Sequence, residues 1–437
     1  MEEEHSNSVK SELSTLLFRK RTYLALFLGM FLVEAVLALW TGQPYDMNIW
    51  FQTGKWMNQG INIYQPDNHL GYPPLWGFWC FISYRAYLFF ANTEIWRLIV
   101  KLPIIFAHLA CAYIIGAFAA NRFGKKVAVK ILLITLTWVF FIYTGAIWGQ
   151  IDTISALLTF LAFYFAITKR PIPSAILLGI AITLKIYPIV TLPAFFIYFY
   201  KNWDAKKAIK YAVYACAVPV LFTLVVFAAF RWDLLYFFRT IFYSTPVFQS
   251  NPIQIDYGCM NIFSFIALQK VNLVPLWSLR LVWIPALTTC FFVWLKKAKM
   301  SEADLTLSII SFYVVFLVSY SWIAEQTFLD VLPFMFIFIF GYNQKRIYLY
   351  LLSLIQVLVF IFTFANQSLF IFTPMLERFW PAGLTTLQNF HSDPQIGPLI
   401  WQIRGTMGLI VSLSLIGFLI LLLKPQITTY FSRKPNR

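Results

Sequence analysis

The sequence predicts an all-α fold, a polytopic bundle of transmembrane helices with roughly twelve spans of about 20 residues each. The 437-residue chain is 60% hydrophobic and 12% charged, and its mean hydropathy is +0.70. A soluble core cannot bury that much apolar surface. Long apolar runs recur along the whole chain. In lipid these runs favour helices, because the period-two pattern of a transmembrane barrel is missing.

The first apolar stretch covers about residues 23–40. It is too long for the core of a signal peptide and lacks a small-residue cleavage site, so we expect it to remain a span. Eleven further stretches have spanning length or fall slightly below it. They lie near residues 97–120, 127–147, 152–168, 171–184, 186–200, 208–230, 277–295, 304–321, 328–342, 346–366 and 401–423.

The charge distribution predicts the orientation of these spans. With the N-terminus in the cytoplasm, the cytoplasmic connections and tails hold 23 Lys and Arg against seven Asp and Glu. The rest of the chain is electrically balanced, so the whole net charge of +16 falls on one side, as the positive-inside rule requires. Both tails, residues 1–21 and 424–437, are therefore predicted to be cytoplasmic. The basic composition indicates membrane orientation and gives no reason to expect nucleic-acid binding.

Residues 73–91 also have the length of a span. Counting them as one would move the basic segment 121–126 to the outside, so we interpret them as a helix on the outer membrane face. The first external loop then covers residues 41–97, and two more external loops cover 231–276 and 367–400. We expect residues 22–342 to form one catalytic module, and 343–423 to add C-terminal transmembrane helices.

The sequence contains no signature of a bound metal, disulfide framework or nucleotide. Its five cysteines are scattered without a CxxC pair. A P-loop is missing, and so is a Gly-rich turn after a strand. We expect no cofactor and no metal, so an enzyme of this kind would take its activated substrate from the lipid.

Three outer segments carry polar residues suited to chemistry. The first holds Asp46, Asn48, His69 and Tyr72, and it can also be interpreted as an aromatic interfacial loop with solvated acids. The second holds Gln150 and Asp152 after the third span, and Lys185 between two short helices. Asp152 could simply cap a helix, whereas Lys185 must snorkel or bind an anion. The third holds Glu325 and Gln326.

Two arginines, Arg231 and Arg239, flank an aromatic external stretch, where Arg also serves as an interfacial anchor. Glu34 lies inside the first span, and we expect it to pair with a base such as Lys101.

Together these segments resemble the GT-C superfamily, in particular the polyprenol- or dolichol-phosphate-mannose-dependent mannosyltransferases and the catalytic subunit of GPI mannosyltransferase I. The resemblance covers about residues 20–340. It depends on the order of several motifs along the chain and on the side of the membrane where each is predicted to lie. These are a helix, the acidic loop, Tyr72-Pro73-Pro74-Leu75, Gly149-Gln150-Ile151-Asp152, Lys185-Ile186-Tyr187-Pro188, and Glu325-Gln326 before Leu332-Pro333-Phe334.

The resemblance implies that the acid of the first loop, Asp46, is the catalytic base. The GPI enzyme has an Asp-x-Asp pair at this place, whereas this chain has Asp46-Met47-Asn48. Asn48 is a poorer ligand for a hard cation, which favours metal-independent catalysis. A single essential acid implies inversion at the anomeric carbon, although Asp67, Asp152 or Glu325 leaves a retaining mechanism open.

The predicted function is transfer of a hexose, with mannose favoured, from a polyprenyl or dolichyl phosphate to a glycolipid or glycan acceptor. Lys185, Arg231 and Arg239 would hold the departing phosphate, because cations in a partly dry site stabilise developing negative charge strongly. The remaining polar residues of the outer segments would contact substrate: Asn48, His69, Tyr72, Gln150, Asp152, Glu325 and Gln326.

We expect a multi-pass protein of the cell membrane, or of the endoplasmic reticulum in a eukaryote. The alternative function is a lipid or solute transporter, since roughly twelve spans with both ends inside is also a transporter layout. A third interpretation is that the protein has the same fold without catalytic activity and serves as a subunit of another transferase.

Overall fold

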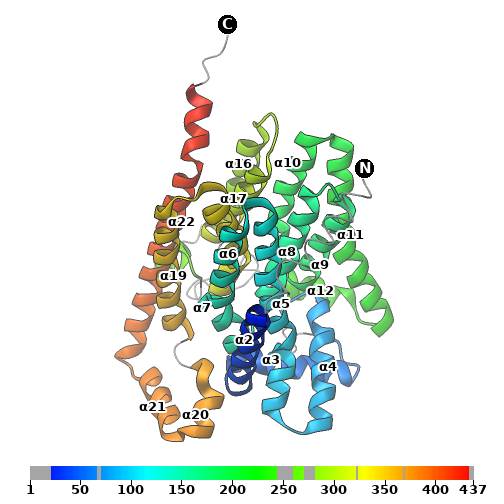
Figure 1. Cartoon of the computed structure of the whole chain (residues 1–437). Helices are drawn as coiled ribbons and strands as arrows, with labels where there is room; N and C mark the ends of the chain where they lie inside the picture. Colours follow the sequence, from blue (N-terminus) through cyan, green and yellow to red (C-terminus); the bar gives the residue numbers. More distant parts are fainter. Residues whose placement is uncertain are drawn as a thin grey trace.

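The computed structural model describes residues 21–65, 70–243, 259–269, 281–320, 323–367 and 370–432 (Figure 1). These ranges contain helices and no strand, which confirms the predicted all-α class. In chain order the elements are α2 (Arg21–Trp40), α3 (Pro44–Asn58), α4 (Pro74–Phe90), α5 (Thr93–Phe123), α6 (Lys125–Thr137), α7 (Val139–Ile142), the π-helical turn η1 (Tyr143–Trp148), α8 (Asp152–Ile167), α9 (Pro171–Leu184), η2 (Tyr187–Thr191), α10 (Leu192–Asn202), α11 (Ala205–Phe230), α12 (Leu234–Tyr243), α14 (Ile262–Leu268), α16 (Trp283–Leu295), α17 (Glu302–Ser319), η3 (Glu325–Val331), α18 (Leu332–Phe336), η4 (Ile337–Asn343), α19 (Arg346–Gln367), η5 (Phe370–Phe372), α20 (Thr373–Phe379), α21 (Pro381–Ser392) and α22 (Ile396–Ser432).

Seven helices of the described part are long and apolar enough to cross a membrane. The bent pair Lys125–Thr137 and Val139–Trp148 makes an eighth if it forms one span, and α8, α9 and α16 are shorter apolar helices. Helices therefore occupy each of the twelve predicted stretches. The number of helices that cross the membrane, and their orientation, remain predictions.

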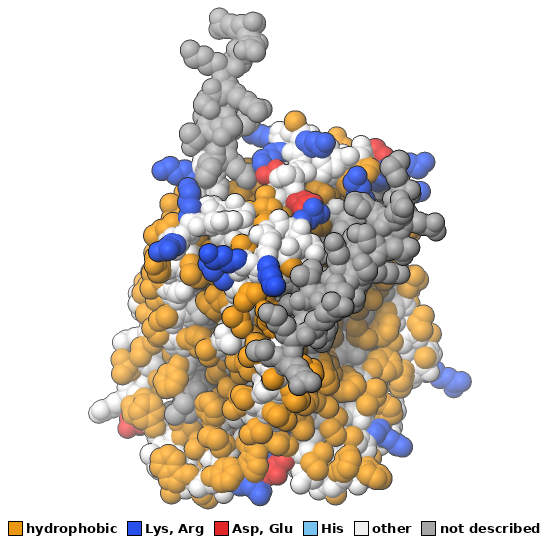
Figure 2. Space-filling view, in the orientation of Figure 1, with side chains coloured by type: hydrophobic (Ala, Val, Ile, Leu, Met, Phe, Trp, Pro, Cys, Tyr) orange, Lys and Arg blue, Asp and Glu red, His pale blue; other side chains and the backbone are white. Residues whose placement is uncertain are grey.

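Charged side chains lie mainly at the ends of the bundle. Figure 2 shows a broad apolar surface, with Lys and Arg gathered at the upper end, where the α10–α11 and α16–α17 connections lie. The helices α3, α4, α20 and α21 occupy the opposite end (Figure 1). This separation is the pattern that the positive-inside rule describes.

The first external loop folds into two helices that pack against each other. The stretch predicted as an interfacial helix, 73–91, is the helix α4. It packs closely on α3 at Gly54, where an added Cβ would lie 2.3 Å from the Cys80 carbonyl oxygen. Only glycine leaves room for this approach, so Gly54 fixes how α4 sits against the helix that carries Asp46.

The third predicted span is bent because the backbone of Trp138 is extended, with φ −68° and ψ 112°. The bend interrupts the helical hydrogen bonds between α6 and α7 and leaves carbonyls near it without a helical partner. His108 of α5 uses one of them, with Nε2 2.9 Å from the Thr135 carbonyl oxygen, and its Nδ1 lies 2.7 Å from Glu34 Oε1. The expected partner of Glu34, Lys101, was therefore wrong: the buried acid pairs with His108, two turns further along α5.

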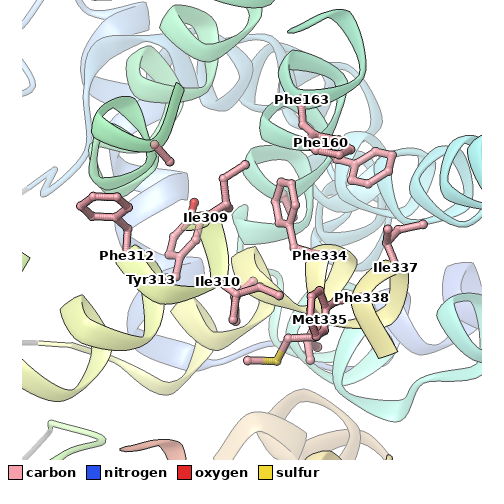
Figure 3. Close-up of a cluster of buried hydrophobic side chains, with 14 of the residues drawn as sticks. Phe160, Phe163, Ile309, Ile310, Phe312, Tyr313, Phe334, Met335, Ile337 and Phe338 are labelled. Carbon is pink, nitrogen blue, oxygen red and sulfur yellow. The ribbon is translucent and has the colours of Figure 1, made fainter. Parts of the chain in front are cut away.

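The largest apolar core joins the central helices to the C-terminal third. Figure 3 shows Phe160 and Phe163 of α8 facing Phe334 of α18, beside Tyr313 of α17. Phe160, Phe163 and Phe334 are fully buried. In lipid such a cluster stabilises the fold through close van der Waals packing, which holds α8 against α17 and α18.

Candidate functional site

Asp46 lies in the first turn of α3. Gln43 caps this helix, with its side-chain oxygen accepting a hydrogen bond from the Asp46 backbone N–H at 2.6 Å, and Pro44 is the first helical residue. Proline suits this position because its fixed φ matches the helix and its missing N–H is not needed there. The carboxylate of Asp46 is thus near the positive end of the helix dipole, which favours its ionised form.

Two side chains donate hydrogen bonds to the same oxygen of this carboxylate. Trp148 Nε1 and Gln150 Nε2 each lie 2.7 Å from Asp46 Oδ2. The Tyr72 hydroxyl donates to Gln150 Oε1 at 3.2 Å, which turns the amide nitrogen toward Asp46. Within the described part of the chain, Oδ1 of Asp46 receives no hydrogen bond. One carboxylate oxygen is held in place, and the other is left for a substrate.

A buried lysine brings Asp46 and Trp148 together. Lys101 of α5 donates three hydrogen bonds from Nζ, to the carbonyl oxygens of Thr41 at 2.8 Å, Ala146 at 2.9 Å and Ile147 at 3.0 Å. Thr41 follows α2 directly, and Ala146 and Ile147 lie in η1. One ammonium therefore bonds to the start of the loop that carries Asp46 and to the turn that carries Trp148. The sequence suggested Lys101 as a partner for Glu34, and this positioning role was missed.

The turn after η1 depends on Gly149. Its φ of +100° lies in the left-handed region, and an added Cβ would lie 2.7 Å from Met47 Cε and 3.0 Å from Lys101 Cε. The chain therefore passes very close to α3 at this point. This close passage places Trp148 and Gln150 on either side of the turn, within reach of Asp46.

Burial raises the pKa of Asp46 above its ordinary value. The hydrogen bonds from Trp148 and Gln150 and the charge of Lys185 oppose this effect, and the charge of Asp152 adds to it. Burial, together with the nearby carboxylates, also raises the pKa of Tyr72 well above its ordinary value. The Tyr72 hydroxyl consequently stays protonated and acts as a donor.

Asp152 and Lys185 form a buried ion pair next to Asp46. The Lys185 Nζ lies 2.5 Å from Asp152 Oδ1, and both side chains are nearly inaccessible. The ammonium also lies 4.9 Å from the centre of the Tyr187 ring. Asp152 begins α8 and Lys185 follows α9, so the antiparallel packing of these helices brings the two charges together. Sequence analysis selected both residues, without predicting that they pair.

A second buried carboxylate, Asp330 of η3, belongs to the same group. It is fully buried, and it interacts electrostatically with Asp152 and Lys185. Sequence analysis missed it because it lies within a stretch counted as a span. The sequence nevertheless contained a signal for Asp330, because an acid within a predicted span is by default a candidate functional residue.

Several other predicted site residues lie apart from Asp46. Asn48 is exposed, because residues two apart on a helix point in different directions. Glu325 is fully buried and accepts hydrogen bonds from Asn366 Nδ2 at 3.0 and 3.1 Å, and Arg404 of α22 interacts electrostatically with it. Gln326, beside Glu325, is almost completely buried.

Of the two predicted arginines, Arg231 lies at the α11–α12 turn and Arg239 lies within α12. Arg231 is exposed at the end of α11 with φ +53°, and the next residues pack against the first external loop through Trp232 and Tyr64. His69 and the side chain of Arg239 lie outside the described part of the structure. Among described residues, no group of three or more His, Cys, Asp or Glu side chains could hold a metal ion.

The helical membrane fold and this polar site together define a membrane glycosyltransferase of GT-C-like type. A family model, Glycosyltransferase family 87, matches residues 72–319. This region is more than half of the chain, so the chain belongs to glycosyltransferase family 87. Gln150, Asp152 and Lys185 lie within the matched region, whereas Asp46 and Asp330 lie on either side of it. Since this family consists of glycosyltransferases, the chain is an enzyme of that class, and neither a transporter nor an inactive subunit is needed to explain its sequence.

A characterised relative gives a finer comparison. GPI mannosyltransferase 1 of Dictyostelium discoideum is 24% identical to this chain over 128 residues. The aligned region covers 29% of this chain and 29% of that protein. This similarity agrees with a membrane glycosyltransferase that resembles mannosyltransferases, and it reaches less than a third of either chain.

Proposed function

We propose that the protein transfers a hexose, with mannose favoured, from a polyprenyl or dolichyl phosphate to a lipid-linked or glycan acceptor, with Asp46 as the catalytic base. The observation that carries this proposal is the asymmetry of the Asp46 carboxylate. Two donors hold Oδ2 at 2.7 Å, and Oδ1 has no partner among the described residues. A base needs one oxygen directed at the proton it removes, and the rest of the group fixed.

In this reaction the acceptor hydroxyl loses its proton to Asp46 Oδ1 while its oxygen forms a bond to the anomeric carbon. The bond between that carbon and the phosphate oxygen breaks, and the phosphate leaves on its lipid with the bonding electron pair. Attack and departure on opposite faces of the sugar invert the anomeric carbon. One base is enough for this route, and a metal ion is not required by it.

The departing phosphate needs nearby positive charge. We assign this role to Lys185, Arg231 and Arg239, as the sequence suggested. Lys185 is supported by its electrostatic interaction with Asp46 and by its ion pair with Asp152, the first residue of α8. Cations in a site that excludes water stabilise such developing charge by several kcal/mol, on the order of 3 kcal/mol for a single donor.

Other polar residues of the outer segments are proposed to support the substrates. Tyr72 and Gln150 act through Asp46, because their hydrogen bonds form one chain that ends on its carboxylate. Glu325 and Gln326 are candidates for acceptor contacts at the other edge of the site, where Asn366 belongs to the C-terminal helices. The name of the Dictyostelium relative supports mannose as the first sugar to test.

The decisive experiment measures sugar transfer in membranes containing the wild type or Asp46→Asn. Polyprenyl phosphate mannose and polyprenyl phosphate glucose serve as donors, with total lipid extract of the host as acceptor. Glu377→Gln is the matched control, because it also neutralises an acid but lies exposed on α20. We expect transfer by the wild type and the control, and a loss of at least 100-fold in Asp46→Asn, as for removal of a general base. Equal transfer by Asp46→Asn would refute the assignment of the base.

A further inference from the structure

The connection between α2 and α3 is short, and each of its residues is hydrogen-bonded to a distant part of the chain. Thr41, Gly42 and Gln43 join the two helices, and Asp46 follows three residues later. The partners of their backbone groups, in that order, are the Lys101 ammonium at 2.8 Å, the Ile371 carbonyl oxygen at 2.8 Å and the Trp148 carbonyl oxygen at 3.4 Å. The position of the base therefore depends on three other segments, and one of them belongs to the C-terminal third of the chain.

This C-terminal contribution comes from residues 371–379, which we call the C-terminal brace. Ile371 lies in η5, and α20 follows directly. Ile371 is fully buried, and its carbonyl oxygen accepts the hydrogen bond from the Gly42 N–H. The helix α20 lies at the same end of the bundle as α3 (Figure 1). The brace lies beyond the region 72–319 that the family model matches, so that match assigns it no role.

The brace also contacts Trp40, the last residue of α2. The Phe379 ring stacks on the Trp40 ring with their centres 4.8 Å apart. The Arg378 guanidinium lies 5.1 Å from the centre of the same ring, within the range of a cation–π attraction. Arg378 Nη1 also lies 2.8 Å from Oε1 of Glu94, which is in the first turn of α5. Arg378 thus connects the brace both to α5 and to the end of α2.

These contacts are better suited to fixing geometry than to stabilising the fold. The side chain of Arg378 is 54% exposed, and Phe379 is 63% exposed. Exposed ion pairs contribute little to the free energy of unfolding, because water screens them. Reaction rates are more sensitive, since displacing a reacting group by about 1 Å can lower the rate roughly 100-fold. Loss of the brace contacts should therefore affect catalysis more than stability.

We propose that the C-terminal brace is part of the catalytic apparatus, and that Arg378 is a positioning residue for glycosyl transfer. Arg378 holds the end of α2 through Trp40, and it fixes the brace to α5 through Glu94. The brace in turn binds Gly42, four residues before the base. The inference rests on the proposed function of Asp46. In this role Arg378 contacts neither substrate, so its removal should change the turnover number and leave the affinities for donor and acceptor as they are.

The test compares kcat and KM of full-length variants in membranes, with polyprenyl phosphate mannose as donor and total lipid extract of the host as acceptor. We expect Arg378→Ala to lower kcat about ten-fold, with unchanged KM for the donor and an unchanged amount of extract at half-maximal rate. Adding Phe379→Ala removes the second contact to Trp40 and should lower kcat about 30-fold in total. Arg378→Lys keeps the charge and should recover most of the lost activity, although it lacks the planar guanidinium.

Arg122→Ala is the matched control. Arg122 Nη2 lies 2.8 Å from Glu302 Oε1, and the two side chains are 43% and 29% exposed, against 54% and 26% for Arg378 and Glu94. Arg122 is in the last turn of α5, so this variant breaks the same kind of ion pair at the other end of the same helix. Its kcat should stay at the wild-type level. Thermal unfolding in detergent should show equally small decreases of the midpoint for Arg122→Ala and Arg378→Ala.

The outcomes separate this inference from the proposed function. A lower kcat in Arg378→Ala that Arg378→Lys recovers and Arg122→Ala does not share supports the positioning role. An unchanged kcat in both Arg378→Ala and the double variant, or an equal loss in Arg122→Ala, would overturn it while leaving Asp46 as the base. A raised requirement for donor or extract at unchanged kcat would also overturn it, because the brace would then be a substrate contact. Full activity of Asp46→Asn would instead refute the proposed function.

Discussion

Replacing Trp148 by Phe tests how the base is controlled. The substitution keeps a large aromatic ring in the site and removes the indole N–H that donates to Asp46 Oδ2 at 2.7 Å. A hydrogen bond to a charged group contributes about 1.5–3 kcal/mol, and 1.36 kcal/mol corresponds to roughly one pKa unit. Because Gln150 still donates to the same oxygen, we expect a shift of about one unit, at the lower end of this range.

The sign of the shift follows from the protonation state that the bond stabilises. Trp148 donates to the carboxylate, so its hydrogen bond opposes the effect of burial, which raises the pKa of Asp46. Without the bond the pKa rises further, and the base is lost by protonation at a higher pH. One unit below the midpoint of the wild-type acid limb, Trp148→Phe should therefore be about ten-fold less active than the wild type.

The assay is the pH profile of kcat/KM for sugar transfer, with Trp50→Phe as the matched control. Trp50 lies on α3, one helical turn after Asp46, and it is fully buried; among the described residues its indole N–H has no hydrogen-bond partner. The same chemical change there should leave the acid limb in place. A downward shift in Trp148→Phe, or equal shifts in both variants, would refute the reasoning.

Two further predictions concern the backbone around the site. Lys101→Met should lower the free energy of unfolding by about 3 kcal/mol, since three buried carbonyls lose a charged donor. It should also lower kcat by about 100-fold, because Asp46 is displaced. Thermal unfolding in detergent measures the first effect, and transfer rates measure the second. An unchanged kcat in a folded variant would contradict the positioning role. Gly149→Ala should lower both stability and kcat, because it combines positive φ with a collision against Met47. The control is Gly60→Ala, where φ is +72° and no described atom lies within 4 Å of the added Cβ. Backbone strain of about 1–2 kcal/mol should be its only cost. Equal kcat values in the two variants would argue against the collision with Met47.

Much of the fold could be predicted from the sequence. The position of residues 73–91 on the outer membrane face stays a prediction, but the apolar runs predicted a helical element at each of twelve places, and a further helix over residues 73–91. Both results depend on local properties, namely length, hydropathy and charge, which act within one segment. The bend at Trp138 could not be predicted, because neither glycine nor an internal proline marks it, and the Thr135 carbonyl beside it is bonded by His108 from another helix.

The candidate site was predicted in part. Asp46, Gln150, Asp152 and Lys185 carry polar groups at the ends of apolar segments, where the sequence makes them conspicuous. Trp148 was not selected, because a tryptophan at the end of a span has the same sequence signature as an interfacial anchor. Its role depends on a hydrogen bond to a residue 102 positions earlier in the chain.

The sequence by itself determined the class of the molecule, because this class follows from the cost of placing charges and backbone in lipid. The side of the membrane on which Asp46 lies stays a prediction from the count of Lys and Arg. The tertiary structure alone decided which charges meet. Lys101 bonds both to the chain after α2 and to η1, and Lys185 pairs with Asp152. These pairings arise from the packing of helices distant in sequence, and helix packing is set by the shapes of whole surfaces, which no single segment contains.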